Sequence, residues 1–121
     1  MAYEHQSASA DGRFELQVEP WEARNSHWVY TPQLRHTASG RVLFQPFASS
    51  WSVDGSTWTG SEVRMFLRKY PGDQPRPGLA ARVDCEREVA WVEGSRDAAP
   101  LAVGQLEAAL ERRLLEGGPD R

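Results

Sequence analysis

Two arginines and two aromatic residues alternate along one short segment, which offers the strongest binding chemistry in this sequence. Their spacing of two residues places them on one face of a β-strand: Arg64, Phe66, Arg68 and Tyr70. Such a face can hold an acidic protein segment through its guanidinium groups, or a single nucleic-acid strand by stacking and charge. The alternative is a charge ladder, in which these arginines pair across strands with Asp84 and Glu86.

Tryptophan is frequent, with five residues in the chain: Trp21, Trp28, Trp51, Trp58 and Trp91. Trp21, Trp51 and Trp58 lie in or beside expected loops, where exposed indole rings can stack on sugars or anchor another molecule. These three are the candidates for a small-ligand or carbohydrate site. The alternative is that Trp51 and Trp58 clamp a tight turn at residues 54–56, while Trp28 and Trp91 fill the core.

The common catalytic patterns are absent: the phosphate-binding G-x-x-x-x-G-K, the dinucleotide-binding G-x-G-x-x-G, G-x-S-x-G and H-E-x-x-H. His27, His36 and Cys85 are the candidate metal ligands, and no two of them form a short-spaced pair. Cys85 is flanked by Asp84 and Glu86, whose charges disfavour a thiolate, so we expect a buried and unreactive thiol. We therefore expect no enzymatic activity, no metal site and no cofactor.

Alternation of apolar and polar residues predicts the strands that position these side chains. The central strand follows the turn at residues 54–56, with Val63, Met65 and Leu67 facing a core and Arg64 facing water. Further strands are expected at residues 13–19, 28–35, 41–47, 81–85 and 88–92. The first of them should end at Pro20, which has no N–H for a ladder hydrogen bond.

The period of the pattern changes near the carboxyl end. Leu106, Leu110 and Leu114 recur at helical spacing, after a proline that suits a first helical position and before a pair of glycines that stops a helix. Burying a leucine contributes roughly 1.5–3 kcal/mol, so this helix should pack on the apolar side of the sheet. We expect an α+β fold: an antiparallel β-meander of five or six strands with one C-terminal amphipathic helix packed on one face.

The chain of 121 residues has the size of one domain. We expect a disordered N-terminal tail over residues 1–12, a single α+β domain over residues 13–117 and a C-terminal tail over residues 118–121. The formal net charge of -3 disfavours nucleic acid as a partner. The chain shows neither a signal-peptide pattern nor a long apolar run, so we expect a cytoplasmic protein with no membrane segment.

Our leading hypothesis is a small, non-enzymatic bacterial interaction module, of adaptor, immunity or regulatory type, that binds a protein partner through the face of Arg64, Phe66, Arg68 and Tyr70. One alternative is a small-ligand or carbohydrate-binding module that uses the loop tryptophans. Another is weak binding of single-stranded nucleic acid by the same strand face. The sequence leaves the identity of the partner and the oligomeric state open.

Overall fold

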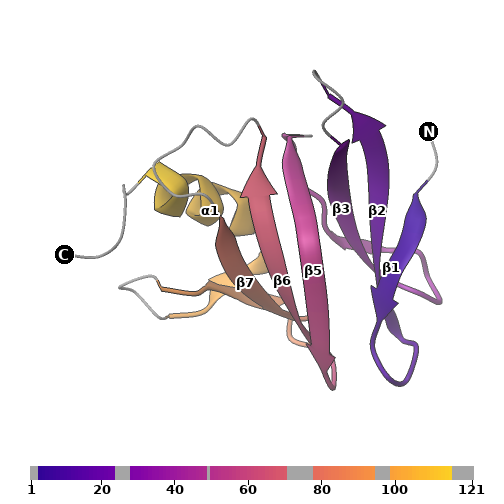
Figure 1. The fold of residues 1–121 in the computed structure, drawn as a ribbon. Helices are drawn as coiled ribbons and strands as arrows, with labels where there is room; N and C mark the ends of the chain where they lie inside the picture. The colour runs from indigo at the N-terminus through magenta and orange to yellow at the C-terminus, as the bar shows by residue number, and fades with distance from the viewer. Residues whose placement is uncertain (1–2, 24–27, 49, 71–77, 95–98, 116–121) are drawn as a thin grey trace.

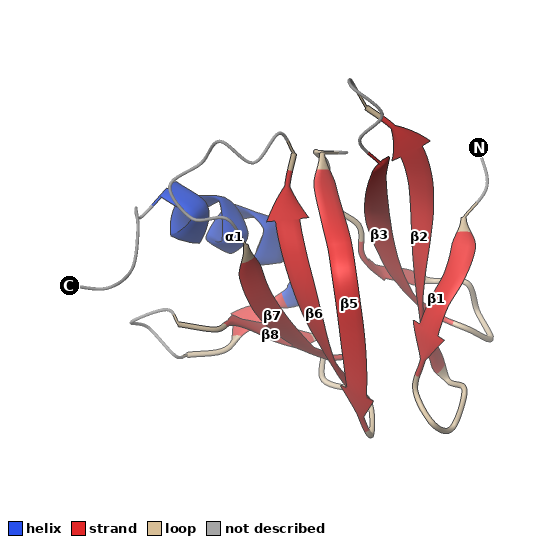
Figure 2. Cartoon of the chain, viewed as in Figure 1, coloured by secondary structure: helices blue, strands red, loops and turns tan. Residues whose placement is uncertain are grey.

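The computed structural model describes residues 3–23, 28–48, 50–70, 78–94 and 99–115, which form two antiparallel sheets and one α-helix (Figures 1 and 2). The first sheet has the order β1 (Glu4–Ala8), β2 (Phe14–Glu22), β3 (Trp28–His36), β4 (Val42–Phe44). The second has the order β5 (Trp51–Thr59), β6 (Glu62–Lys69), β7 (Leu79–Asp84), β8 (Val89–Val92), β9 (Leu101–Ala102). A short 3-10 turn, η2 (Val103–Gln105), leads into the helix α1 (Leu106–Leu115).

The α+β class, with antiparallel strands and one C-terminal helix, is confirmed. The structure differs from the expected single sheet of five or six strands, because the described residues form four strands in one sheet and five in the other. The strands that the sequence pattern missed are β1, β5 and β9. None of the three has the regular apolar–polar alternation by which the other strands were expected.

Strand β1 replaces most of the expected N-terminal tail. It pairs antiparallel with β2, with Glu4 opposite Val18 and Ala8 opposite Glu15. The expectation of a disordered tail over residues 1–12 is therefore wrong for residues 4–8. Backbone hydrogen bonds to β2 hold this strand, which has no apolar face of its own. The expected C-terminal tail over residues 118–121 lies outside the described residues.

The turn expected at residues 54–56 is wrong, because strand β5 runs through these residues. The pairing of β5 with β6 shifts register between Val53 and Gly55, as a β-bulge does, and continues on the far side. The chain reverses later, between Thr59 and Glu62, where Gly60 has a φ of +59°. A glycine at the first position of a two-residue hairpin loop takes this conformation without steric cost, so Gly60 fixes the hairpin.

Proline does not end β2 as expected, because Pro20 lies within the strand opposite Tyr30. The backbone N–H of Tyr30 points away from β2 and donates to Ser52 Oγ at 3.0 Å. In a non-hydrogen-bonded antiparallel pair, the backbone N–H and C=O groups of both residues point away from the partner strand, so the backbone nitrogen of Pro20 points away from β3. Pro20 lies beyond Val18, where the described pairing with β1 ends, so its missing N–H removes no ladder hydrogen bond between described residues.

The inward faces of both sheets and one face of α1 form a single hydrophobic cluster. On β6 the alternation is as expected, with Val63 and Met65 0% exposed and Leu67 1% exposed. The helix contributes Leu106, Ala109, Leu110 and Leu114, and lies behind the second sheet in Figure 1. The predicted packing of this helix on the apolar side of the sheet is confirmed.

Candidate functional site

The outward face of the second sheet carries the predicted arginine and aromatic residues. Arg64 lies directly opposite Arg82 on β7, and Arg82 lies opposite Trp91 on β8, so the three share the face that Phe66 also occupies. Among the described residues no strand or helix packs on this face. We call the following group the Arg–aromatic patch: Arg64, Phe66, Arg82, Trp91 and Glu93.

Glu93 connects the two arginines of the patch. Arg64 donates to its carboxylate from Nε at 2.6 Å and from Nη2 at 2.7 Å, and Arg82 Nε lies 3.7 Å from Oε2 of the same group. The hydrogen bonds from Arg64 lower the pKa of Glu93, with burial acting in the opposite direction. Glu93 is therefore ionised at neutral pH and holds both guanidinium groups in place.

Both guanidinium groups also lie over aromatic rings. Arg64 Cζ is 4.4 Å from the centre of the Phe66 ring, and Arg82 Cζ is 4.9 Å from the centre of the Trp91 ring. These distances are within the range of cation–π attraction. Phe66 remains 37% exposed, which is high for an aromatic side chain in the middle of a strand.

The other two residues of the predicted strand face stand apart from the patch. Arg68 pairs with Asp54 on the neighbouring strand, with Nε 2.7 Å from Oδ2. Tyr70 follows the end of β6, and its backbone N–H donates to the Ser50 carbonyl at 2.9 Å. The predicted row is therefore divided, and only Arg64 and Phe66 belong to the patch.

The arginines are paired with carboxylates, but the predicted partners Asp84 and Glu86 are wrong for Arg64 and Arg68. Asp84 instead closes the turn between β7 and β8, where its Oδ1 accepts from the backbone N–H groups of Glu86 and Arg87, both at 3.1 Å. This use of an aspartate in a turn is common. Glu86 extends from that turn toward the first sheet.

The three tryptophans proposed for a ligand site lie in strands and not in loops, and they are distributed over both sheets. Trp51 is 1% exposed and donates its indole N–H to Glu111 Oε2 at 3.2 Å, so it belongs to the core. Trp58 is half-buried on β5 and donates to Ser7 Oγ at 2.9 Å. Trp21 is on β2, in the other sheet, where it donates to Thr31 Oγ1 at 3.0 Å.

The two tryptophans expected in the core are not there. Trp28 is 51% exposed, because it begins β3 beyond the part of that strand that packs on the core. Trp91 is half-buried on the outward face of the second sheet, where Arg82 covers it. In each case a strand position was correctly expected, but the side of the sheet was not.

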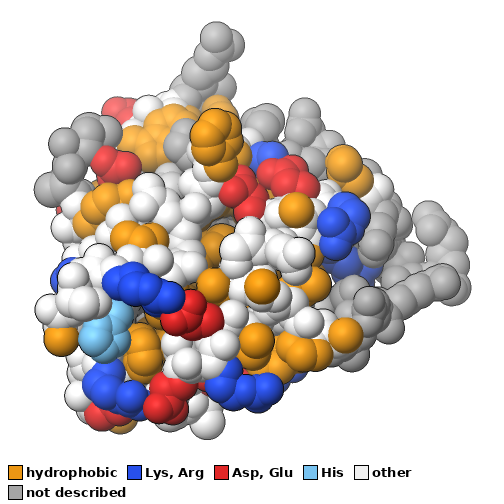
Figure 3. Space-filling model, turned by 180° about the vertical axis from the view of Figure 1, so that it is seen from behind, with side chains coloured by type: hydrophobic (Ala, Val, Ile, Leu, Met, Phe, Trp, Pro, Cys, Tyr) orange, Lys and Arg blue, Asp and Glu red, His pale blue; other side chains and the backbone are white. Residues whose placement is uncertain are grey.

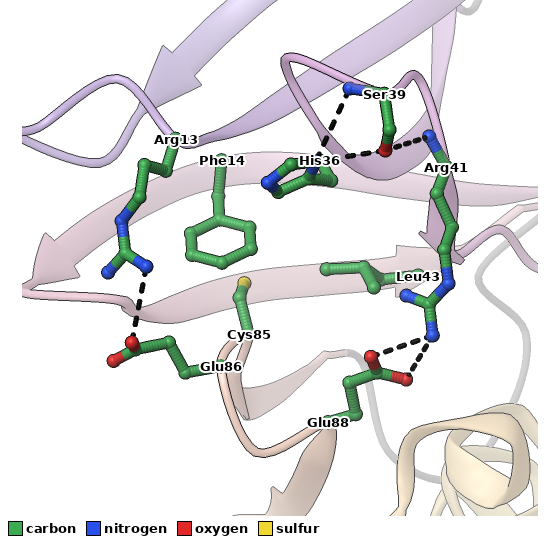
Figure 4. A pocket seen from close by; sticks show the side chains of 9 residues that line it. All are labelled: Arg13, Phe14, His36, Ser39, Arg41, Leu43, Cys85, Glu86 and Glu88. Carbon is green, nitrogen blue, oxygen red and sulfur yellow. Dashed lines mark hydrogen bonds and ion pairs between the residues drawn. The ribbon is translucent and has the colours of Figure 1, made fainter.

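A cavity of about 400 Å³ lies between the ends of the two sheets, and sequence analysis did not predict it. We call it the intersheet pocket (Figure 4), and it is lined by Arg13, Phe14, His36, Ser39, Arg41, Leu43, Cys85, Glu86 and Glu88. The first six belong to the first sheet and its turns, and the last three to the turn between β7 and β8. Figure 3 shows histidine, basic and acidic side chains gathered around hydrophobic ones on the back of the molecule.

Two ion pairs join the sheets at opposite ends of this pocket (Figure 4). Arg13 Nη1 donates to Glu86 Oε2 at 3.2 Å, and Arg41 Nη2 donates to both carboxylate oxygens of Glu88 at 2.7 Å. The hydrogen bonds from Arg41 lower the pKa of Glu88. Glu88 has a φ of 57°, and it is the only described residue other than glycine with a positive φ. Local strain of this kind often marks a site with a function.

His36 has a defined tautomer in this pocket. The backbone N–H of Ser39 points at His36 Nδ1 at 3.3 Å, and the Ser39 hydroxyl oxygen, which accepts from the Arg41 N–H, lies 2.9 Å from the same nitrogen. Nδ1 is therefore an acceptor, and the neutral ring carries its proton on Nε2. Among the described residues this Nε2–H has no hydrogen-bond partner.

Cys85 forms part of the pocket wall and is 2% exposed. Burial, with smaller contributions from the charges of Asp84 and Glu88, raises its pKa to about 12. The group is therefore a thiol at neutral pH. Because the thiolate is the nucleophilic form of cysteine, Cys85 is not placed to act as a nucleophile. The predicted burial of Cys85 is confirmed.

The described residues contain no group of three or more His, Cys, Asp or Glu side chains placed to hold a metal ion, and His27 of the candidate ligands lies outside them. No described helix has the length and apolar character needed to cross a membrane. Comparison with protein families, with curated proteins and with solved structures finds no match for this chain.

Proposed function

We propose that this chain is a small cytoplasmic bacterial interaction module, of adaptor, immunity or regulatory type, with no enzymatic activity of its own. It binds a folded protein partner through the Arg–aromatic patch. The observation that supports this proposal is the placement of Arg64 and Arg82 over Phe66 and Trp91, with Glu93 holding both arginines.

The patch has the composition of a binding hot spot. Tryptophan and arginine are enriched among the residues that dominate binding free energy at protein interfaces, and Phe66 adds an exposed aromatic ring. Ordering a long side chain on binding costs about 0.5–1.5 kcal/mol. Arg64 is already held by two hydrogen bonds and a ring, so it loses less conformational freedom when a partner arrives.

A hollow of about 410 Å³ adjoins the patch and gives a partner side chain a place to enter. Phe66 and Arg68 of β6 form one side of it, and Gly78 to Ala80 at the start of β7 form the other. Aromatic and apolar anchors commonly fill hollows of this kind at interfaces. The partner we propose is a folded protein that presents one apolar side chain to this hollow and backbone carbonyl groups to the N–H groups of Arg64 that do not donate to Glu93.

The charge of the patch favours a protein over a nucleic acid. Arg64 and Arg82 are balanced by Glu93 and by Glu62, whose Oε2 lies 3.4 Å from Arg82 Nη1. A surface that binds phosphate backbones needs an excess of positive charge. The patch has no such excess, so we do not propose that it binds single-stranded nucleic acid.

The test is affinity capture from lysate with a matched set of variants. The double substitution Phe66→Ala with Arg64→Gln removes an exposed ring and a cation while leaving the inward residues of β6 in place. Arg112→Gln, on the exposed side of α1, is the control. We expect at least one protein that wild type and control retain in equal amount and the double variant loses. A set of captured proteins that is the same for all three chains would contradict the proposal.

A further inference from the structure

The intersheet pocket shares no residue with the Arg–aromatic patch, and its chemistry is different. We propose that it binds a small zwitterion, an α-amino acid with an apolar side chain. The carboxylate pairs with Arg13 and His36, the ammonium group pairs with Glu86, and the side chain contacts Phe14 and Leu43.

Arg13 and His36 provide donors for a carboxylate. Arg13 donates from Nε to Asp11 at 2.7 Å, from Nη1 to Glu86 at 3.2 Å and from Nη2 to Ser61 at 2.9 Å. A guanidinium group has five N–H donors, so two remain without a partner among the described residues. The Nε2–H of His36 is a further donor in the same pocket, and its direction is fixed because Ser39 holds Nδ1.

Glu86 is the acceptor for an ammonium group. Its side chain is 57% exposed, and its one ion pair among the described residues, to Arg13 at 3.2 Å, is longer than the pair between Arg41 and Glu88 at 2.7 Å. The weaker pair is the one that a ligand can enter. Arg13 stays in place when Glu86 turns to a ligand, because Asp11 and Ser61 still hold it.

The wall between the two ion pairs is apolar. Phe14, Leu43 and Cys85 line this wall and are 5%, 8% and 2% exposed, so a ligand side chain contacts only the small part of their surface that faces the pocket. The Arg13 guanidinium lies over the Phe14 ring, with Cζ 5.1 Å from its centre. Charged donors therefore border the apolar surface directly, as recognition of an amphipathic molecule requires.

Charge balance selects a zwitterion over an ion of one sign. The pocket carries Arg13 and Arg41 against Glu86 and Glu88, with Asp11 behind Arg13. A simple anion would face the repulsion of both glutamates, and a simple cation that of both arginines. A zwitterion replaces the pair between Arg13 and Glu86 by two new ion pairs and leaves no charge without a partner.

The test is calorimetric titration of the full chain with L-phenylalanine, 3-phenylpropionate and 2-phenylethylamine. The three molecules share a phenyl ring, and the last two each carry only one of the charges. We expect L-phenylalanine to bind at least about tenfold more tightly than either of them. Equal affinity for 3-phenylpropionate, or no binding of L-phenylalanine, would overturn the proposal.

Substitutions test whether the ligand binds in the intersheet pocket. Glu86→Gln removes the ammonium partner and should weaken L-phenylalanine binding about tenfold while leaving 3-phenylpropionate unaffected or improved. Arg112→Gln on α1 is the control and should change neither affinity. Imidazole nitrogen shifts of His36 on titration provide a second measurement. Binding that moves no His36 signal and does not respond to Glu86→Gln would contradict a site in this pocket.

Discussion

The Glu93 carboxylate and the Arg64 guanidinium meet through two hydrogen bonds, of 2.6 Å and 2.7 Å, on the outward face of the second sheet. The two residues are 29 positions apart in sequence. The same carboxylate lies 3.7 Å from Arg82. Glu93 therefore organises the whole Arg–aromatic patch, and its removal should affect both stability and binding.

The first prediction concerns the pH dependence of stability. The pKa of Glu93 is lowered in the folded protein, so the folded state binds fewer protons than the unfolded state when the solution is acidified. This stabilisation is complete above the pKa of the unfolded state, about 4.3, and is lost as the pH falls through the folded pKa. Glu93→Gln should therefore lower the free energy of unfolding by about 0.5–1 kcal/mol at neutral pH and much less in acid.

Urea denaturation at several pH values between neutral and about 3 measures this effect. Glu22→Gln is the control, because Glu22 is exposed and forms no ion pair with another described residue. The control should follow the pH dependence of wild type. A Glu93→Gln chain that loses stability as steeply as wild type below neutral pH would show that Glu93 does not contribute in this way.

The second prediction tests the packing of α1. Leu110 is 0% exposed within the hydrophobic cluster, and Leu115 on the same helix is 70% exposed. Leu110→Ala should destabilise the fold by about 2–5 kcal/mol, because it leaves a cavity as well as losing buried area. Leu115→Ala should change stability by less than about 0.5 kcal/mol. Thermal denaturation of the two variants measures the difference, and similar melting temperatures would contradict the position of the helix.

The third prediction concerns two glycines. Gly94 has a φ of +79°, and a Cβ at this position would lie 2.8 Å from Arg113 Nη2. Gly94→Ala should destabilise the fold by about 1–3 kcal/mol, since alanine is unfavourable in this region and the arginine must move. Gly104 in η2 has open space around it, so Gly104→Ala should be neutral or slightly stabilising. Chemical denaturation that ranks the two variants in the reverse order would contradict the prediction.

The fourth prediction tests strand β1. Ser7 Oγ accepts from the indole N–H of Trp58 at 2.9 Å and lies 2.7 Å from Ser56 Oγ. Ser7→Ala leaves the indole group without this acceptor and should cost about 0.5–1.5 kcal/mol, with a change in tryptophan fluorescence. Gln6→Ala, on the same strand and exposed, should do neither. If both variants behave as wild type, β1 does not contribute to the fold in this way.

The sequence was informative where one face of an element is apolar. The alternation of Val63, Met65 and Leu67 identified β6 and its buried side, and the leucines of α1 identified the helix and its contact. It failed at β5, where Asp54 and Gly55 have the composition of a turn but form a bulge. Composition alone does not distinguish a turn from a β-bulge, because glycine is common in both.

The intersheet pocket could not have been found by spacing. Arg13 and Glu86 are 73 positions apart, and Arg41 and Glu88 are 47 apart, so no local pattern connects them. Only Asp84, which closes the turn of Glu86 and Glu88 with its side chain, gives a local signal of how those glutamates are positioned. The pairs themselves depend on how the two sheets meet.

The most direct test of the proposed interaction is photo-cross-linking in the native host. Benzoylphenylalanine replaces Phe66 in the patch in one chain, and replaces Leu115, which is also exposed but lies on α1, in another. We predict that illumination attaches a specific protein to the chain with the probe at position 66, that Glu93→Gln weakens this adduct, and that position 115 gives no such adduct. Adducts that are identical at both positions, or absent at position 66, would contradict the assignment of this patch as the recognition surface.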